Sequence, residues 1–181
     1  HLACRRGHLD VVELLQPVIN ENIPDLFGWT SLHHAARKGH CLVVRHLLQQ
    51  SKLPMNFMLA TEYDQGSSAV HLAACNAHYR VILVMLDCAR ELDTSRRHPT
   101  KPMGSPASKP AASKTAGESG AASALARIGN VKDLAGRTPL HRAAATACEA
   151  LAGDARAQET FQRACKVAET LLDAGAAVLA E

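Results

Sequence analysis

Histidine and cysteine are the side chains of this sequence best suited to metal binding or catalysis, and both are plentiful. The 181 residues include ten histidines and six cysteines. A zinc site needs such ligands in a cluster, commonly with two cysteines separated by two residues. The sequence contains no C-x-x-C pair and no H-E-x-x-H motif. It therefore predicts no metal site, and nothing in it indicates a bound cofactor.

Motifs of common catalytic sites are missing from the sequence as well. It lacks the G-x-S-x-G turn of serine hydrolases and the glycine-rich loop that cradles phosphates. Cys75 is the cysteine we expect to be most exposed, but its sequence surroundings give no sign of a reactive thiol. We therefore predict that the chain is not an enzyme.

The histidines instead belong to a pattern that recurs four times. The pattern combines a hydroxyl residue, an apolar residue and a histidine, followed by a pair of small residues and, further on, paired Val, Leu, Ile or Met residues at helical spacing. The first copy starts at the histidine. The copies begin at His1, Gly28, Gly66 and Gly136. The fourth copy contains the sequence T-P-L-H-x-A from Thr138 to Ala143.

This pattern resembles the ankyrin repeat, in which T-P-L-H-x-A recurs at about 33 residues. The resemblance covers most of the chain and implies an all-α repeat solenoid, with stacked helix-turn-helix units and β-hairpin or turn tips. It also implies a structural role for seven histidines, which bond to the turns or to nearby backbone. These are His1, His33, His71 and His141 in the motif, and His8, His40 and His78 at the Gly-His turn or its equivalent.

Residue types at the predicted helix ends agree with that fold. Thr30 and Ser68 stand where a helix N-cap is expected, because a hydroxyl can bond the first unpaired amides. Gly7 and Gly39 are predicted to end the first helix of their repeats. The alanine pairs are small enough for neighbouring helices to approach closely.

We predict a single repeat domain over residues 1–181, with one helical and one disordered insertion. The repeats are assigned to residues 1–24 (truncated), 25–62, 63–95 and 133–181, with a helical insertion at 147–163 and a low-complexity disordered insertion at 94–124. The insertion at 147–163 is expected to lengthen both helices of its repeat. The extra length in residues 51–61 is expected to be an apolar loop. Because the pattern is incomplete at both ends, we interpret the sequence as a fragment.

The low-complexity insertion is also basic and contains Ser105 followed by Pro106. A solvated linker is the favoured interpretation. The alternative is a regulated tether, in which Ser105 is a site of proline-directed phosphorylation.

The resemblance implies that partners bind on a concave face, formed by the tips and by the residues after the small pairs. The residues mapped to this face are Arg5, Arg6, Leu26, Phe27, Trp29, Arg37, Lys38, Asp64, Gln65, Asn76 and Arg137. Arg5, Arg6, Arg37 and Lys38 are expected to form a basic cluster beside the aromatic pair of the second tip. An ordinary solvated surface is the alternative for the cluster, and packing against an adjacent hairpin is the alternative for Trp29.

We expect a non-catalytic scaffold or adaptor that binds a partner protein segment carrying acidic and large apolar residues. The alternative is the regulatory part of a larger enzyme, such as a kinase, ubiquitin ligase or acyltransferase. Binding of anionic lipid or nucleic acid ranks last, because the net charge of +3 is small. No apolar run is long enough to span a membrane. The scattered cysteines favour reduced thiols and a cytoplasmic protein, or a nuclear one, and we expect a monomer.

Overall fold

Helices make up the regular structure of the computed structural model, which describes residues 1–15, 23–51, 54–63, 65–97, 124–151 and 155–175. In chain order they are α1 (Leu2–Arg6), α2 (Leu9–Leu15), α3 (Ser31–Lys38), α4 (Cys41–Gln50), α5 (Pro54–Leu59), α6 (Ala69–Cys75), α7 (Tyr79–Arg97), α8 (Ala124–Gly129), α9 (Pro139–Leu151) and α10 (Ala155–Asp173).

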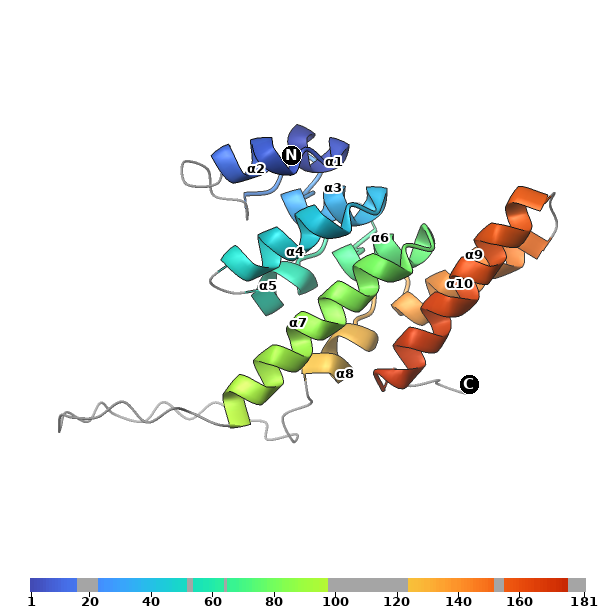
Figure 1. Ribbon diagram of the computed structural model, residues 1–181. Coiled ribbons are helices and arrows are strands. Elements are labelled where there is room, and N and C mark those ends of the chain that lie inside the picture. Colours follow the sequence, from blue (N-terminus) through green and yellow to red (C-terminus); the bar gives the residue numbers. More distant parts are fainter. Residues whose placement is uncertain (16–22, 52–53, 64, 98–123, 152–154, 176–181) are drawn as a thin grey trace.

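The helices stack as antiparallel pairs in two layers. The first helices of the pairs, α1, α3, α6 and α9, pack in sequence against one another, and so do the second helices, α2, α4, α7 and α10. Figure 1 shows the pairs following one another from the N-terminal to the C-terminal end. The predicted all-α repeat solenoid is therefore confirmed. Within the described residues the tips are turns rather than β-hairpins, and one isolated bridge joins Thr61 to Ser68.

Small residues let the first helices lie close together. The alanine pairs at 35–36 and 73–74 are completely buried between neighbouring repeats. Larger apolar side chains, among them Leu47, Ile82 and Leu171, fill the space between the two layers. A single pair of helices could not bury these surfaces, so the core exists only because the repeats stack.

Two buried histidines, His33 and His71, bond both to the start of their own helix and to the backbone beside the next turn. The Nδ1 atom of His33 accepts hydrogen bonds from the backbone N–H of Thr30 (3.2 Å) and from its hydroxyl (2.8 Å). Because an N–H can only donate, Nδ1 carries no proton. The proton is therefore on Nε2, which donates to the carbonyl oxygen of Ala60 at 2.9 Å. His71 makes the same contacts with Ser68 and with the carbonyl oxygen of Arg137.

The predicted local role of these histidines is confirmed, and the structure adds a second role. Nε2 of His1, His33 and His71 also bonds a backbone carbonyl oxygen beside the next turn, at Ile23, Ala60 and Arg137 respectively. The sequence motif indicates the local bonds but not these bonds to the next turn. Each of these imidazoles therefore joins the start of its helix to the next turn.

Stability is expected to fall on acidification because His33 is held neutral. Burial lowers its pKa from 6.5 to about 4. Between these values the unfolded chain takes up a proton that the folded chain does not, so the free energy of unfolding decreases as the pH falls. Each pKa unit is worth about 1.4 kcal/mol, which gives about 3 kcal/mol for this histidine. Urea unfolding at pH 7 and at pH 4 measures the loss.

The matched control is His33→Gln, which cannot titrate. Its free energy of unfolding should depend less on pH than that of the wild type, by about 3 kcal/mol over the same range. Equal pH dependence of the two proteins would contradict the assignment.

Two short helices precede the third and fourth turns, and the first of them corrects an expectation. Residues 51–61, expected to be an apolar loop, contain α5, and Met58 on this helix is completely buried. The helix forms because its apolar side chains find a site against α4, α6 and α7. Helix α8 occupies the corresponding place before the fourth turn and packs against α7 and α5.

The low-complexity insertion is shorter than expected at both ends. Residues 94–97 form the last turn of α7, and Ala124 begins α8. The carboxylate of Asp93 accepts a hydrogen bond from the backbone N–H of Ala124 at 2.9 Å, which joins the two ends of the insertion. The remaining residues, Ser105 included, lie outside the described part of the chain.

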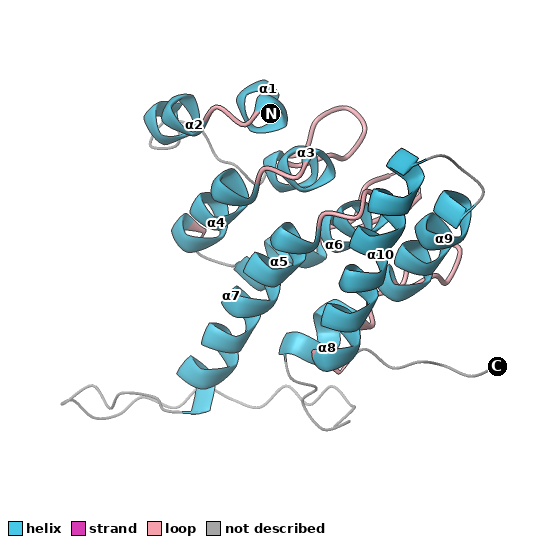
Figure 2. Cartoon of the chain, turned by 45° about the vertical axis from the view of Figure 1, so that its right-hand side comes forward, coloured by secondary structure: helices cyan, strands magenta, loops and turns pink. Residues whose placement is uncertain are grey.

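The fourth repeat has the longest pair of helices among the described repeats. Helix α9 has 13 residues and α10 has 19, whereas α3 has 8 and α4 has 10. Residues 147–151 and 155–163 of the assigned insertion belong to these helices. Figure 2 shows α9 and α10 side by side at the C-terminal end of the stack, where α10 packs on α7.

A candidate protein-binding groove

A groove of about 1130 Å³ crosses the first three repeats on the side that carries the turns. Its walls come from two kinds of element, the turn tips and the C-terminal ends of the first helices. The lining residues are Arg5, Asp25, Leu26, Phe27, Trp29, His34, Arg37, Lys38, Glu62, Tyr63, Gln65, Ser67, His71, Leu72, Cys75, Asn76 and Arg142. The predicted concave face is thus an open groove between these walls.

One wall is basic and is built from helix ends. Arg5 lies in the last turn of α1, and Arg37 and Lys38 lie in the last turn of α3. All three side chains are exposed. Cations at helix C-termini also interact favourably with the helix dipole, so this placement does not strain the fold.

A second set of histidines holds the helix ends of this wall. Nε2 of His40 bonds the carbonyl oxygen of Arg5 at 3.1 Å, and Nε2 of His78 bonds that of Arg37 at 3.0 Å. Each bond ties the end of one first helix to the start of the second helix of the next repeat. For these two histidines the expected bond to nearby backbone is confirmed.

Trp29 also lines the groove, and its indole ring packs against Arg37 of the basic wall. The guanidinium of Arg37 lies over the indole ring, 5.0 Å from its centroid. The imidazole of His34 lies 5.3 Å from the same ring and bonds the carboxylate of Asp25 at 2.9 Å. Trp29 is half-buried and packs against residues of α3. It therefore positions Arg37 instead of standing free as an aromatic anchor.

The opposite wall is apolar and is built from turn tips. Leu26 is 94% exposed, Phe27 71% and Tyr63 69%. The second and third tips are joined by a hydrogen bond from the backbone N–H of Tyr63 to the carbonyl oxygen of Phe27 at 3.2 Å. The aromatic ring of Tyr63 lies against Gly28, where a Cβ atom would come within 2.8 Å of it. Large apolar side chains therefore remain accessible along two consecutive tips.

Aspartates hold the second and fourth turns in shape. One carboxylate oxygen of Asp25 accepts hydrogen bonds from the backbone N–H groups of Phe27 and Trp29. Asp133 bonds two N–H groups of the fourth turn in the same way. Burial alone would raise the pKa of Asp25, but the bonds from His34 and from the turn hold it below its usual value.

Arg142 lines the groove where the third and fourth repeats meet. Its guanidinium bonds the carboxylate of Asp133 at 2.8 Å, the amide oxygen of Gln65 at 3.0 Å and the hydroxyl of Ser67 at 3.1 Å. Burial would raise the pKa of Asp133, but hydrogen bonds from the Arg137 backbone and from Arg142 lower it. The ion pair holds Arg142 at the fourth tip, and its bonds to Gln65 and Ser67 link that tip to the third.

Most of the residues predicted for the binding face lie together in this groove. Those that line it are Arg5, Leu26, Phe27, Trp29, Arg37, Lys38, Gln65 and Asn76. Arg6 is exposed but does not line the groove. Arg137 does not line it either, because its guanidinium is turned to Asp133 at 3.1 Å. Asp64 lies outside the described residues.

Sequence reasoning missed several residues that line the groove or hold its turns. Asp25 and Asp133 both stand three residues before the turn glycine, a recurrence that could have identified them. Tyr63 occupies the same place in the third repeat and breaks the pattern, so no repeat signal points to it. The role of Arg142 depends on groups of the preceding repeat, which are distant in sequence.

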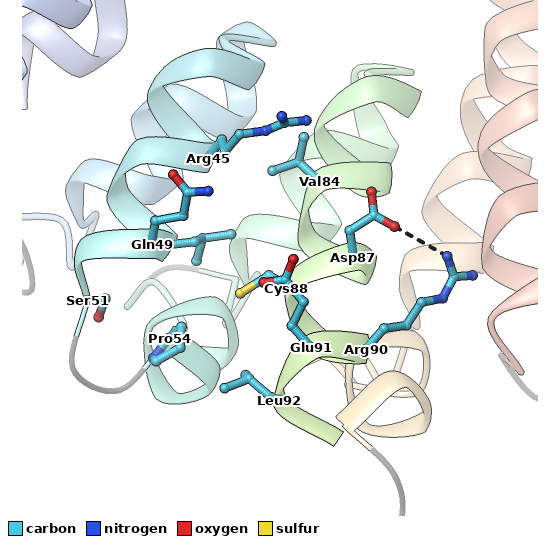
Figure 3. Close-up of a pocket in the computed structure, with 11 residues that line it drawn as sticks. Arg45, Gln49, Ser51, Pro54, Val84, Asp87, Cys88, Arg90, Glu91 and Leu92 are labelled. Atoms are coloured by element: carbon cyan, nitrogen blue, oxygen red, sulfur yellow. Dashed lines mark hydrogen bonds and ion pairs between the residues drawn. The ribbon is translucent and has the colours of Figure 1, made fainter. Parts of the chain in front are cut away.

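A second pocket, of about 760 Å³, lies between α4 and α7 on the other side of the repeats. Figure 3 shows Arg45 and Gln49 on α4 facing Cys88 on α7, with the ion pair of Asp87 and Arg90 at one rim. None of the residues predicted from the sequence lines it. Its walls carry both charges, with Arg45 and Arg90 beside Asp87 and Glu91.

Other kinds of site receive no support from the described residues. No three His, Cys, Asp or Glu side chains among them are placed to hold a metal ion together. In the same part of the chain, no helix has the length and apolar character needed to cross a membrane. Burial raises the pKa of the Cys4 and Cys88 thiols, which makes both less reactive.

Comparison with known proteins agrees with the repeat pattern. A family model described as ankyrin repeats, in three copies, matches residues 1–97, more than half of the chain. The chain is 36% identical over 87 residues to a probable E3 ubiquitin-protein ligase, XBOS33, of Oryza sativa subsp. japonica. That match covers 48% of this chain and 16% of that protein. It is 26% identical over 103 residues to ankyrin repeat and SOCS box protein 3 of Bos taurus, a match that covers 56% of this chain and 19% of that protein.

A further relative is the SMC5-SMC6 complex localization factor protein 1 of Bos taurus, 33% identical over 88 residues. That match covers 48% of this chain and 8% of the relative. In all three cases the matched part is less than a fifth of the relative's length.

Proposed function

The chain belongs to the ankyrin repeat family, and we propose that it is a non-catalytic module that holds a segment of a partner protein in the groove. The observation that carries this proposal is the arrangement of the two walls. Helix ends of two repeats present cations, turn tips of two repeats present exposed apolar side chains, and both walls face the same open groove. A protein segment is the ligand that can use both at once.

The chemistry of the walls indicates a segment with acidic and large apolar residues. Carboxylates would meet Arg5, Arg37 and Lys38, which would mainly set the association rate and its dependence on salt. Apolar side chains would cover Phe27 and Leu26, which would mainly slow dissociation. Because the indole of Trp29 already holds the Arg37 guanidinium, little side-chain freedom is lost when a carboxylate binds it.

An unbiased peptide selection tests this proposal. Peptides displayed on phage are selected on the whole chain and then measured by fluorescence anisotropy. We expect the selected peptides to carry acidic and large apolar residues. Arg37→Glu should weaken their binding at least about tenfold, and Phe27→Ala by about 2 kcal/mol. Raising the salt concentration should slow association in the wild type and less so in Arg37→Glu.

Arg127→Glu is the matched control, because Arg127 is an exposed arginine in the last turn of α8 and does not line the groove. It carries the same charge change and should leave the affinity unchanged. Selected peptides that bind Arg37→Glu and Phe27→Ala as tightly as the wild type would place the binding site elsewhere.

A second candidate function is that this module recruits substrates for a larger ubiquitin ligase. The observation in its favour is that XBOS33 and the Arabidopsis thaliana relative XBAT33 are both named as E3 ubiquitin-protein ligases, each 36% identical over 87 residues. The complete reading frame, followed by a ubiquitin-transfer assay of its product, tests this candidate. A product without ligase activity would leave the adaptor function alone.

The proposal includes a monomer in the cytoplasm or the nucleus. The cysteines among the described residues are all free, as expected for a reducing compartment. Sedimentation at several concentrations tests the monomer, and imaging of the tagged full-length product tests the location.

A further inference from the structure

The two walls of the groove take their residues from overlapping sets of repeats. The cations come from the first and second repeats, with Arg5 on α1 and with Arg37 and Lys38 on α3. The corresponding end of α6 in the third repeat presents Cys75 and Asn76, which are neutral. Among the helix ends that line the groove, positive charge therefore ends at the second repeat.

The exposed apolar residues come from the tips of the second and third repeats. Phe27 and Leu26 belong to the tip of the second repeat, and Tyr63 belongs to the tip of the third. The next tip continues the row, because the backbone N–H of Leu134 bonds the carbonyl oxygen of Gln65 at 3.0 Å and its side chain is 76% exposed. Cations and exposed apolar side chains thus occur together at the second repeat.

A segment that contacts the same position in each successive repeat must match the distance between repeats, and this limits its conformation. Neighbouring packed helices are about 8–10 Å apart. In a polyproline II segment, residues three apart lie on the same side and are separated by about 9 Å. In a β-strand, residues two apart lie on the same side and are separated by about 7 Å. The separation of about 9 Å in polyproline II therefore matches the spacing of successive repeats, whereas the separation of about 7 Å in a β-strand is too short.

We propose that the partner segment has two acidic residues three apart, followed or preceded by two large apolar residues three apart, in a polyproline II conformation. The acidic pair contacts Arg5 and then Arg37 with Lys38. The apolar pair contacts Phe27 and then Tyr63. The inner acidic residue and the inner apolar residue are adjacent, since both lie at the second repeat. This inference rests on the function proposed above and specifies its ligand.

Synthetic peptides of one composition test the spacing. The first has Glu at positions 1 and 4 and Leu at positions 5 and 8, in a Pro- and Ser-containing background. The comparison peptide has Glu at positions 1 and 3 and Leu at positions 4 and 6. Both are also made with the acidic and apolar pairs in the opposite order. We expect the better peptide with the three-residue spacing to bind at least about tenfold more tightly than either comparison peptide.

Charge reversal tests the register. Arg5→Glu should prefer a peptide with Lys in place of the outer Glu, and Arg37→Glu should prefer one with Lys in place of the inner Glu. The two matched pairs should each bind at least about tenfold more tightly than the two crossed pairs, because only the matched pairs place opposite charges together.

The outcomes separate this inference from the function on which it rests. Equal affinity for both spacings, with binding still lost in Arg37→Glu, overturns the spacing and leaves the groove as the site. No binding by any of these peptides, while selected peptides do bind the groove, overturns the inference as well. If selected peptides bind Arg37→Glu and Phe27→Ala as tightly as the wild type, the proposed function itself is overturned.

Discussion

Asp133→Ala is expected to reduce the free energy of unfolding by about 4 kcal/mol, because it leaves the buried Arg142 guanidinium without its counter-ion. The Asp133 side chain is completely buried, and that of Arg142 is 15% exposed. The substitution also removes the acceptor of two turn N–H groups, at Ala135 and Arg137. Urea unfolding followed by circular dichroism measures the change.

Asp87→Ala is the matched control. Asp87 also pairs with an arginine, Arg90 at 3.3 Å, but its side chain is 58% exposed. Exposed pairs contribute about 0–1 kcal/mol, so this variant should unfold almost as the wild type does. If Asp133→Ala were as mild as Asp87→Ala, Asp133 would not hold the fourth turn and the Arg142 guanidinium in place as the structure indicates.

The repeat pattern predicts the helices of the fold because local chemistry decides their ends. A hydroxyl at Thr30 or Ser68 begins a helix, and Gly39 ends one in a left-handed conformation. Such signals lie within a few residues of one another and recur at the same spacing. The basic wall was predictable for the same reason, since the resemblance places Arg5 and Arg37 at equivalent helix ends.

Features that depend on distant groups could not be predicted in this way. Helix α5 forms because Met58 finds a buried site between helices, not because of a local signal. The position of Trp29 beneath Arg37 depends on the packing of the second tip against α3. Arg142 bonds Gln65 and Ser67, more than seventy residues earlier in the chain. Each requires the stacked repeats to be known first.

The other prediction with a large effect concerns the glycine that ends α3. Gly39 has φ of +81°, and a Cβ atom on it would lie 2.8 Å from the imidazole of His78. Gly39→Ala therefore costs about 1–2 kcal/mol for the left-handed backbone and about 1–3 kcal/mol for the clash. Displacing the imidazole also breaks its bond to the carbonyl oxygen of Arg37. We expect a total loss of about 4 kcal/mol in the free energy of unfolding, measured by urea titration.

Gly136→Ala separates the clash from the backbone conformation. Gly136 has a similar φ of +75°, but none of the described residues lies within 4 Å of a Cβ atom placed there. This variant should lose only about 1–2 kcal/mol. The difference between the two variants measures the contact of Gly39 with His78. Because that contact holds the end of α3, Gly39→Ala should also weaken peptide binding at Arg37 in the fraction that remains folded, whereas Gly136→Ala should not. Equal losses in the two variants would show that His78 does not position the basic wall.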